Sequence, residues 1–81
     1  MKISYECSEL IEELEEDIIK FGENEEVIVW CKNIDGTTIY TNYDFDTDMK
    51  IHSSEVEKDE YLIKIPMKDL LTKLREQNKI L

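Results

Sequence analysis

The fold is decided by the stretch from Val27 to Tyr43, whose sequence is Val-Ile-Val-Trp-Cys-Lys, then Asn-Ile-Asp-Gly-Thr, then Thr-Ile-Tyr-Thr-Asn-Tyr. Both arms are rich in β-branched and aromatic residues, and the pair Asp35-Gly36 lies between them. This pattern predicts a β-hairpin. We expect a three-residue loop that pairs Asn33 with Thr37 and holds Gly36 in the left-handed conformation.

This register assigns the two faces of the predicted hairpin. On the core face, it pairs Cys31 with Ile39, Val29 with Thr41, and Val27 with Tyr43. On the other face, Trp30 lies beside Tyr40 among polar residues. An aromatic pair in polar surroundings is typical of a binding interface, and cross-strand stacking is the alternative explanation.

The chain is small and strongly acidic. Its 81 residues predict a single domain, residues 1–81, with one core. Hydrophobic residues make up 41% of the chain, which argues against intrinsic disorder although 37% are charged. The net charge is −10, and residues 1–48 hold 14 acidic and only 3 basic side chains. Such a charge repels nucleic acid and anionic membranes, so the expected partner is a basic protein surface.

Much of this acidity lies on one predicted amphipathic helix. Apolar residues follow helical spacing from Cys7 to Phe21, with Ser8 as the expected N-cap and Gly22 as the expected stop. Lys2–Tyr5 before it is expected to be an edge strand or an unstructured lead-in. The opposite face carries the candidate partner-binding residues Glu12, Glu13, Glu16 and Asp17. That face is either a solvated exterior or a docking surface for a basic partner.

The last third of the chain completes an α+β fold. Tyr61–Ile65 alternates as a strand with Tyr61, Ile63 and Ile65 facing the core, and Pro66 ends it. A closing helix follows, with an inner stripe at Met67, Leu70, Leu71, Leu74, Asn78 and Leu81. We therefore predict an antiparallel sheet of three to four strands with two helices on one face, in the order (β)αβββα.

The segment after the hairpin resembles a calcium loop of the EF-hand type. Acidic residues occupy loop positions one, three, five and twelve, which are Asp44, Asp46, Asp48 and Glu55. Position six, however, is Met49 where the turn needs glycine, and a strand rather than a helix precedes the loop. An acidic connector is the favoured interpretation, so no metal and no cofactor are expected.

Other chemistry is scarce in the sequence. Cys7 and Cys31 form neither a disulfide framework nor a metal motif, and Cys31 alternates with core residues. The lone histidine, His52, has no Cys or His neighbour, and no nucleophile motif or phosphate-binding loop occurs. We therefore expect a protein that is not an enzyme. Without an apolar leader or span, a reduced cytoplasmic protein is the simplest expectation.

Three segments together suggest a family resemblance. The helix Leu10-Ile11-Glu12-Glu13-Leu14, the strand from Glu26 to Val29 and the turn Asp35-Gly36 resemble the small acidic proteins that phages encode to block host defences, anti-CRISPR proteins among them. The resemblance implies an inhibitor that occupies the basic groove of a nucleic-acid-handling effector, such as a CRISPR effector or a nuclease. The alternatives are a homo-oligomeric regulatory or structural protein, such as a homodimer formed through Trp30 and Tyr40, and a calcium-binding module.

Overall fold

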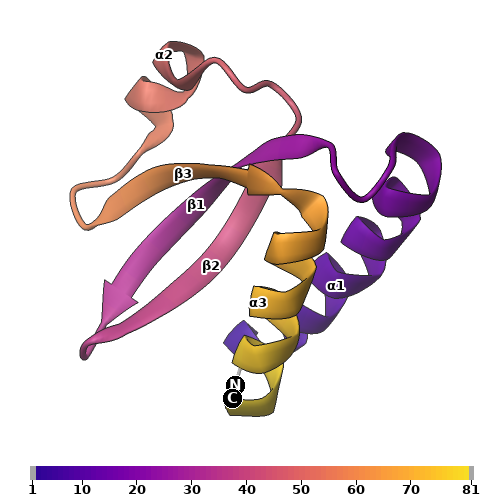
Figure 1. The fold of residues 1–81 in the computed structure, drawn as a ribbon. Coiled ribbons are helices and arrows are strands. Elements are labelled where there is room, and N and C mark those ends of the chain that lie inside the picture. Colours follow the sequence, from indigo (N-terminus) through magenta and orange to yellow (C-terminus); the bar gives the residue numbers. More distant parts are fainter. Residues whose placement is uncertain (1, 81) are drawn as a thin grey trace.

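The computed structural model describes residues 2–80 and the side chains of residues 7–79. Its elements, in chain order, are α1 (Lys2–Phe21), β1 (Glu26–Ile34), β2 (Thr37–Asp44), α2 (Met49–His52), the 3-10 helix η1 (Ser53–Glu55), β3 (Glu60–Pro66) and α3 (Met67–Ile80). The three strands form one antiparallel sheet in the order β2-β1-β3 (Figure 1). The predicted α+β class is confirmed.

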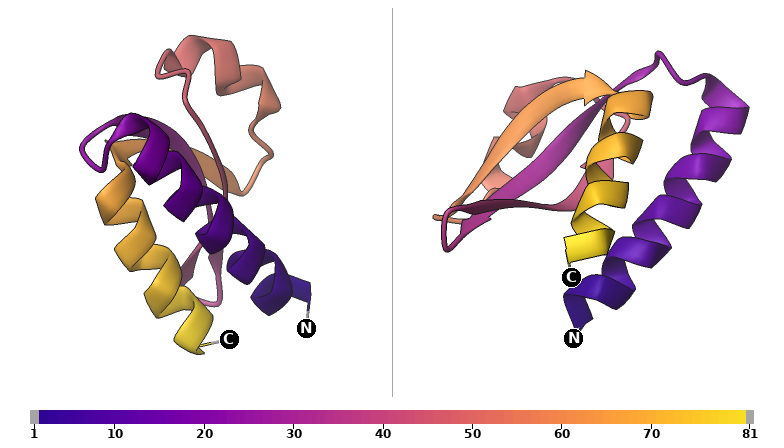
Figure 2. Two further views of the ribbon diagram at one scale, coloured as in Figure 1. Left: turned by 90° about the vertical axis from the view of Figure 1, so that its right-hand side faces the viewer. Right: turned by 60° about the horizontal axis from the view of Figure 1, so that its bottom comes forward.

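The two long helices lie side by side on one face of the sheet, as predicted (Figures 1 and 2). The core between them and the sheet consists of Cys7 and Leu14 from α1, Val27, Val29 and Cys31 from β1, and Met67, Leu70 and Leu74 from α3. Each of these side chains is at most 1% exposed, so the stripes predicted from apolar spacing are the ones that pack. Phe21, the last residue of the predicted stripe on α1, is the exception, because it is 56% exposed.

The helix α1 begins at Lys2, five residues before the predicted helical stripe. The predicted strand or lead-in at Lys2–Tyr5 is therefore wrong, and so is Ser8 as the N-cap. In the sequence, Ile3 continues the helical spacing of Cys7, and a helix satisfies its own backbone groups without a strand partner. The other end agrees with the prediction: the amide of Gly22 donates to the carbonyl of Ile18 at 2.8 Å, with a φ of +100°.

The hairpin turn is one residue shorter than predicted. Ile34 pairs with Thr37, and the two loop residues Asp35 and Gly36 both have positive φ, at 51° and 79°. Two consecutive residues with positive φ are typical of a type I′ turn, whose twist matches that of the strands. The expected three-residue loop that pairs Asn33 with Thr37 is therefore wrong.

The shorter turn changes which side chains share a face. Cys31 pairs with Tyr40, and an irregularity between Trp30 and Cys31 then pairs Trp30 with Asn42. Because side chains alternate along a strand, a shift of one residue moves Tyr40 to the helix-covered face, opposite Trp30. The predicted aromatic pair of Trp30 and Tyr40 is wrong.

The segment from Asp44 to Glu55, which was expected to be an acidic connector, covers the second face of the sheet. It forms α2 and η1, which lie on the side of the sheet away from α1 and α3 (Figures 1 and 2). His52 in α2 is 3% exposed, and its ring meets that of Trp30 edge-on with centroids 5.0 Å apart. Trp30 is consequently 7% exposed, and it belongs to the interior rather than to an open surface.

The turn between α1 and β1 also holds the start of α3. The carbonyls of Glu25 and Glu23 accept from the amides of Met67 and Lys68 at 2.9 and 3.0 Å. These bonds satisfy donors that have no partner inside a helix, and they fix α3 beside α1. On β3, Ile63 and Ile65 pack against the core as predicted, whereas Tyr61, at the start of the strand, is 41% exposed. Leu81, the last residue of the predicted stripe, lies outside the described residues.

Candidate interaction surface

The outer face of α1 is an exposed row of carboxylates. Glu12, Glu13 and Glu16 are exposed, and no ion pair joins them to any described side chain. Glu12 and Glu16 are four residues apart, so they are neighbours of like charge, and such a pair costs about 0.2–0.5 kcal/mol. The acidic face predicted from the sequence therefore lies at the surface with its charges uncompensated.

Glu15, at the edge of this row, has a different role. Arg75 Nη2 in α3 donates to Glu15 Oε2 at 2.8 Å, which joins the two long helices across their outer side. Both side chains are about half exposed, so the pair contributes at most about 1 kcal/mol. Glu15 is thus paired with a cation, and it is not part of the open acidic row.

Asp17 is tied to the sheet rather than free. The hydroxyl of Tyr43 in β2 donates to Asp17 Oδ2 at 2.6 Å. Burial raises the pKa of Tyr43, and the hydrogen bond to Asp17 and the nearby charges of Asp17, Glu13 and Glu16 raise it further. Tyr43 therefore remains a neutral donor at any physiological pH. Of the four predicted acidic residues, Asp17 also holds α1 on β2.

A second acidic segment adjoins the end of α1. The rings of Phe21, at the end of α1, and Phe45, directly after β2, lie with centroids 4.9 Å apart. Tyr43 and Phe45 are also in ring contact, at 6.1 Å. These contacts bring the acidic residues Asp44 and Asp46 next to the C-terminal half of α1, although the two segments are separated by the whole hairpin in the sequence.

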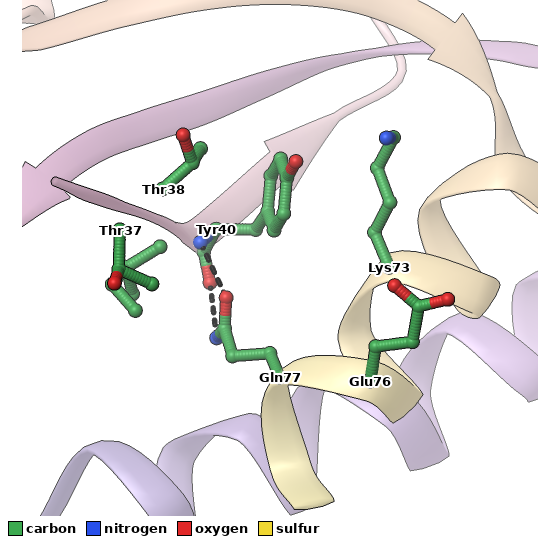
Figure 3. Close-up of a pocket in the computed structure, with 7 residues that line it drawn as sticks. Thr37, Thr38, Tyr40, Lys73, Glu76 and Gln77 are labelled. Atoms are coloured by element: carbon green, nitrogen blue, oxygen red, sulfur yellow. Dashed lines mark hydrogen bonds between the residues drawn. The ribbon is translucent and has the colours of Figure 1, made fainter. Parts of the chain in front are cut away.

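Tyr40, the other half of the predicted aromatic pair, faces α3. Figure 3 shows the side chain of Gln77 bonded twice to the backbone of Tyr40: its Oε1 accepts from the Tyr40 amide at 2.7 Å, and its Nε2 donates to the Tyr40 carbonyl at 3.1 Å. The ammonium of Lys73 lies 5.7 Å from the centre of the Tyr40 ring. Sequence reasoning missed Gln77, although it continues the spacing of Leu70 and Leu74 and a polar residue there indicates a buried hydrogen bond.

A shallow groove lies beside Tyr40, between β2 and α3 (Figure 3). It has a volume of about 160 Å³ and is lined by Thr37, Thr38, Ile39, Tyr40, Lys73, Glu76 and Gln77. Sites for small ligands usually enclose about 300–1,000 Å³. The groove has room for a few water molecules rather than for a substrate.

The predicted calcium segment uses its carboxylates on its own backbone. Asp44, Asp46 and Asp48 each accept from the amide two residues ahead, at 3.3, 3.0 and 3.0 Å, and the last of these bonds caps α2. Glu55 accepts from His52 Nδ1 at 3.2 Å. Within the described residues, no three His, Cys, Asp or Glu side chains gather in a way that could hold a metal ion.

Both thiols are buried and free. Cys7 Sγ donates to the carbonyl of Leu74 at 3.3 Å, and Gln77 Nε2 donates to Cys7 Sγ at 3.6 Å. Burial raises the pKa of Cys7, and it raises that of Cys31 to about 11 despite the opposing charge of Lys73. The thiols therefore stay protonated, and they act as small core side chains.

Within the part that the structure describes, no helix has both the length and the apolar character to cross a membrane. Comparison of the chain with protein-family models, with curated proteins and with solved structures gave no significant match.

Proposed function

We propose that this chain is a small acidic binding protein that docks on the basic surface of a nucleic-acid-handling effector, such as a CRISPR effector or a nuclease, and inhibits it by mimicking nucleic acid. The observation that carries the proposal is the exposed face of α1, where Glu12, Glu13 and Glu16 lie without a cation from the described side chains. A basic groove would supply the missing counter-charge.

The charge density of this face is close to that of a duplex. With a rise of about 1.5 Å per residue, Glu12, Glu13 and Glu16 place three charges within about 6 Å of helix axis. Double-stranded DNA carries one charge per about 1.7 Å of its axis. A groove that holds DNA through lysine and arginine therefore meets a comparable row of anions on α1.

The other two functions considered from the sequence lack such a surface. A homodimer formed through Trp30 and Tyr40 needs both side chains on one open face, and they lie on opposite faces of the sheet. A calcium-binding module needs the carboxylates of Asp44, Asp46 and Asp48 to converge, and among the described residues these side chains do not gather into a group that could hold a metal ion. The acidic residues Glu12, Glu13 and Glu16 of α1, in contrast, are exposed, as the proposed docking needs.

The test compares two variants of equal net charge. In the face variant, Glu12, Glu13 and Glu16 are replaced by glutamine, which leaves Asp17 and Glu15 to hold α1 in place. In the control, Asp35→Asn, Glu57→Gln and Asp59→Asn remove three charges from exposed turns, which lie across the molecule from α1 (Figure 1). Glu57 and Asp59 lie 4.0 and 3.7 Å from the ammonium of Lys32, and ion pairs this exposed contribute little to stability. Both variants have a net charge three units less negative than the wild type.

Each protein is immobilised and exposed to a nuclease-treated bacterial lysate, and bound proteins are eluted with duplex DNA and identified by mass spectrometry. We expect the wild type and the control to retain nucleic-acid-binding proteins that DNA displaces, and the face variant to lose them. Association should slow as salt screens the charges over a Debye length of about 10 Å at 0.1 M. Equal retention by the face variant, or retention that DNA does not reverse, contradicts the proposal.

A further inference from the structure

The end of α1 carries an exposed aromatic cluster that the core does not use. Phe21 is 56% exposed and Phe45 is 40% exposed, yet their rings are in contact at 4.9 Å. Tyr43 continues the row at 6.1 Å from Phe45 and joins it to the sheet. A contiguous exposed apolar patch with a polar rim is typical of protein–protein interfaces. Aromatic residues are enriched among the residues that contribute most to binding energy in such interfaces.

Carboxylates rim this cluster. Asp17 accepts from the hydroxyl of Tyr43, and Glu13 and Glu16 lie close enough for their charges to act on the same hydroxyl. Asp44 and Asp46 flank Phe45 in the chain, and both are exposed. A partner that covers the rings must therefore bring both apolar contact and positive charge.

Arginine meets both requirements in one side chain. Its planar guanidinium stacks on the face of an aromatic ring and at the same time donates two parallel hydrogen bonds to a carboxylate. The ammonium of lysine is a compact, strongly hydrated charge that does neither as well. We infer that Phe21 and Phe45 form an arginine-selective docking site on the acidic surface, and that the partner presents arginine side chains there. This inference rests on the proposed function, because it names the chemistry of the basic surface that the protein binds.

The test uses two defined peptides. One contains only arginine and glycine, and the other has lysine in place of every arginine, so that both have the same charge. Dissociation constants are measured by fluorescence anisotropy for the wild type and for the double variant Phe21→Leu/Phe45→Leu, which keeps apolar bulk but removes both rings. A second double variant, Ile19→Ala/Ile34→Ala, alters exposed apolar residues that are 84% and 40% exposed elsewhere.

We expect the wild type and the Ile19/Ile34 variant to bind the arginine peptide more tightly than the lysine peptide, by about two- to fivefold for each ring contacted. The Phe21/Phe45 variant should bind both peptides alike. The triple glutamine variant at Glu12, Glu13 and Glu16 should weaken the binding of both peptides and still prefer arginine, because both rings and the carboxylates of Asp17, Asp44 and Asp46 remain.

Equal binding of the two peptides by the wild type, or a preference that survives loss of both rings, overturns the inference and leaves the acidic docking surface intact. If the wild type binds neither peptide at low salt, the electrostatic basis of the proposed function fails as well. Circular dichroism of each variant verifies that the fold is retained, so that every change in binding is assigned to the surface.

Discussion

At the scale of single residues, Gln77 closes a sheet edge that would otherwise be open. Strand β2 is an edge strand, and the amide and carbonyl of Tyr40 point away from β1. Unpaired edge groups are a template for pairing with another chain. Gln77, 6% exposed on α3, bonds to both groups, so one side chain substitutes for a neighbouring strand at this point.

Replacing Gln77 with leucine should therefore destabilise the fold. The variant keeps the volume of the side chain but leaves two backbone groups unpaired, at a cost of about 1–3 kcal/mol for a buried group. Urea unfolding followed by circular dichroism measures the loss, and light scattering over a concentration series detects pairing of the opened edge. The control is Glu76→Leu, one position earlier and exposed. If the two variants unfold at the same urea concentration, Gln77 does not support the edge.

At the scale of elements, the segment from Asp44 to Glu55 is held by short-range hydrogen bonds together with the ring contacts of Phe45 and His52. Its helix α2 has only four residues, too few to be stable alone. Besides its backbone caps, it is held by His52, whose Nδ1 faces Glu55 Oε2 at 3.2 Å and whose Nε2 faces the carbonyl of Asp46 at 3.1 Å. Both partners are acceptors, so only the protonated imidazole donates to both. Protonation therefore determines how firmly α2 covers Trp30.

This arrangement gives a pH dependence with a defined sign. The hydrogen bond to Glu55 raises the pKa of His52 from 6.5; burial opposes it, and the carbonyl of Asp46 and the charges of Asp44 and Glu55 add to it. Because the folded pKa is raised, this stabilisation is fully present below pH 6.5, the unfolded value, and is lost as pH rises through the folded value. We expect the fluorescence of Trp30, the single tryptophan, to shift to the red as α2 loosens over this rise.

The control for this prediction is His52→Gln. His52 is the only histidine, so the variant should lose the pH dependence of the fluorescence between mildly acidic and mildly alkaline pH, apart from any effect of the N-terminal amine. Opposite behaviour, with α2 more firmly packed at alkaline pH, would mean that neutral His52 is the form that the site prefers.

At the scale of the whole molecule, repulsion between the many carboxylates opposes folding. The net charge of −10 is spread over a chain with a radius of gyration of 12.2 Å, and its acidic excess lies in residues 1–48. The described ion pair between the long helices, Glu15 with Arg75, offsets little of this repulsion because both groups are about half exposed. The fold thus retains a repulsion that a basic partner or dissolved salt relieves.

Sodium chloride should therefore stabilise the wild type. Raising the ionic strength from about 0.01 M to about 0.1 M shortens the Debye length from about 30 Å to about 10 Å, which screens the repulsion between separated carboxylates. We expect the melting temperature to rise, and to rise less in the variant with glutamine at Glu12, Glu13 and Glu16. A melting temperature that falls with salt would show that attractive pairs such as Glu15–Arg75 outweigh the repulsion.

The pattern of apolar residues was sufficient to predict the layers of this molecule. Helical spacing located the core stripes of α1 and α3, alternation located Val27, Val29 and Cys31, and Asp35-Gly36 located the turn. These features are local. Apolar residues that recur every two residues in a strand, or about every 3.6 residues in a helix, identify the apolar face of that element whatever it packs against. The exposed row at Glu12, Glu13 and Glu16 followed from the same spacing.

The tertiary structure alone decided which residues meet across elements. A turn one residue shorter moved Tyr40 to the helix face, where Gln77 holds it, and α2 placed His52 over Trp30. Likewise, Asp17 meets Tyr43, and Phe21 meets Phe45, across distant segments of the chain. Such pairs depend on strand register and on how a connector folds back. The length of the turn sets the register of the hairpin, and a slip of one residue exchanges the two faces of a strand. The alternation of apolar residues along each strand does not state which of the two registers the hairpin adopts.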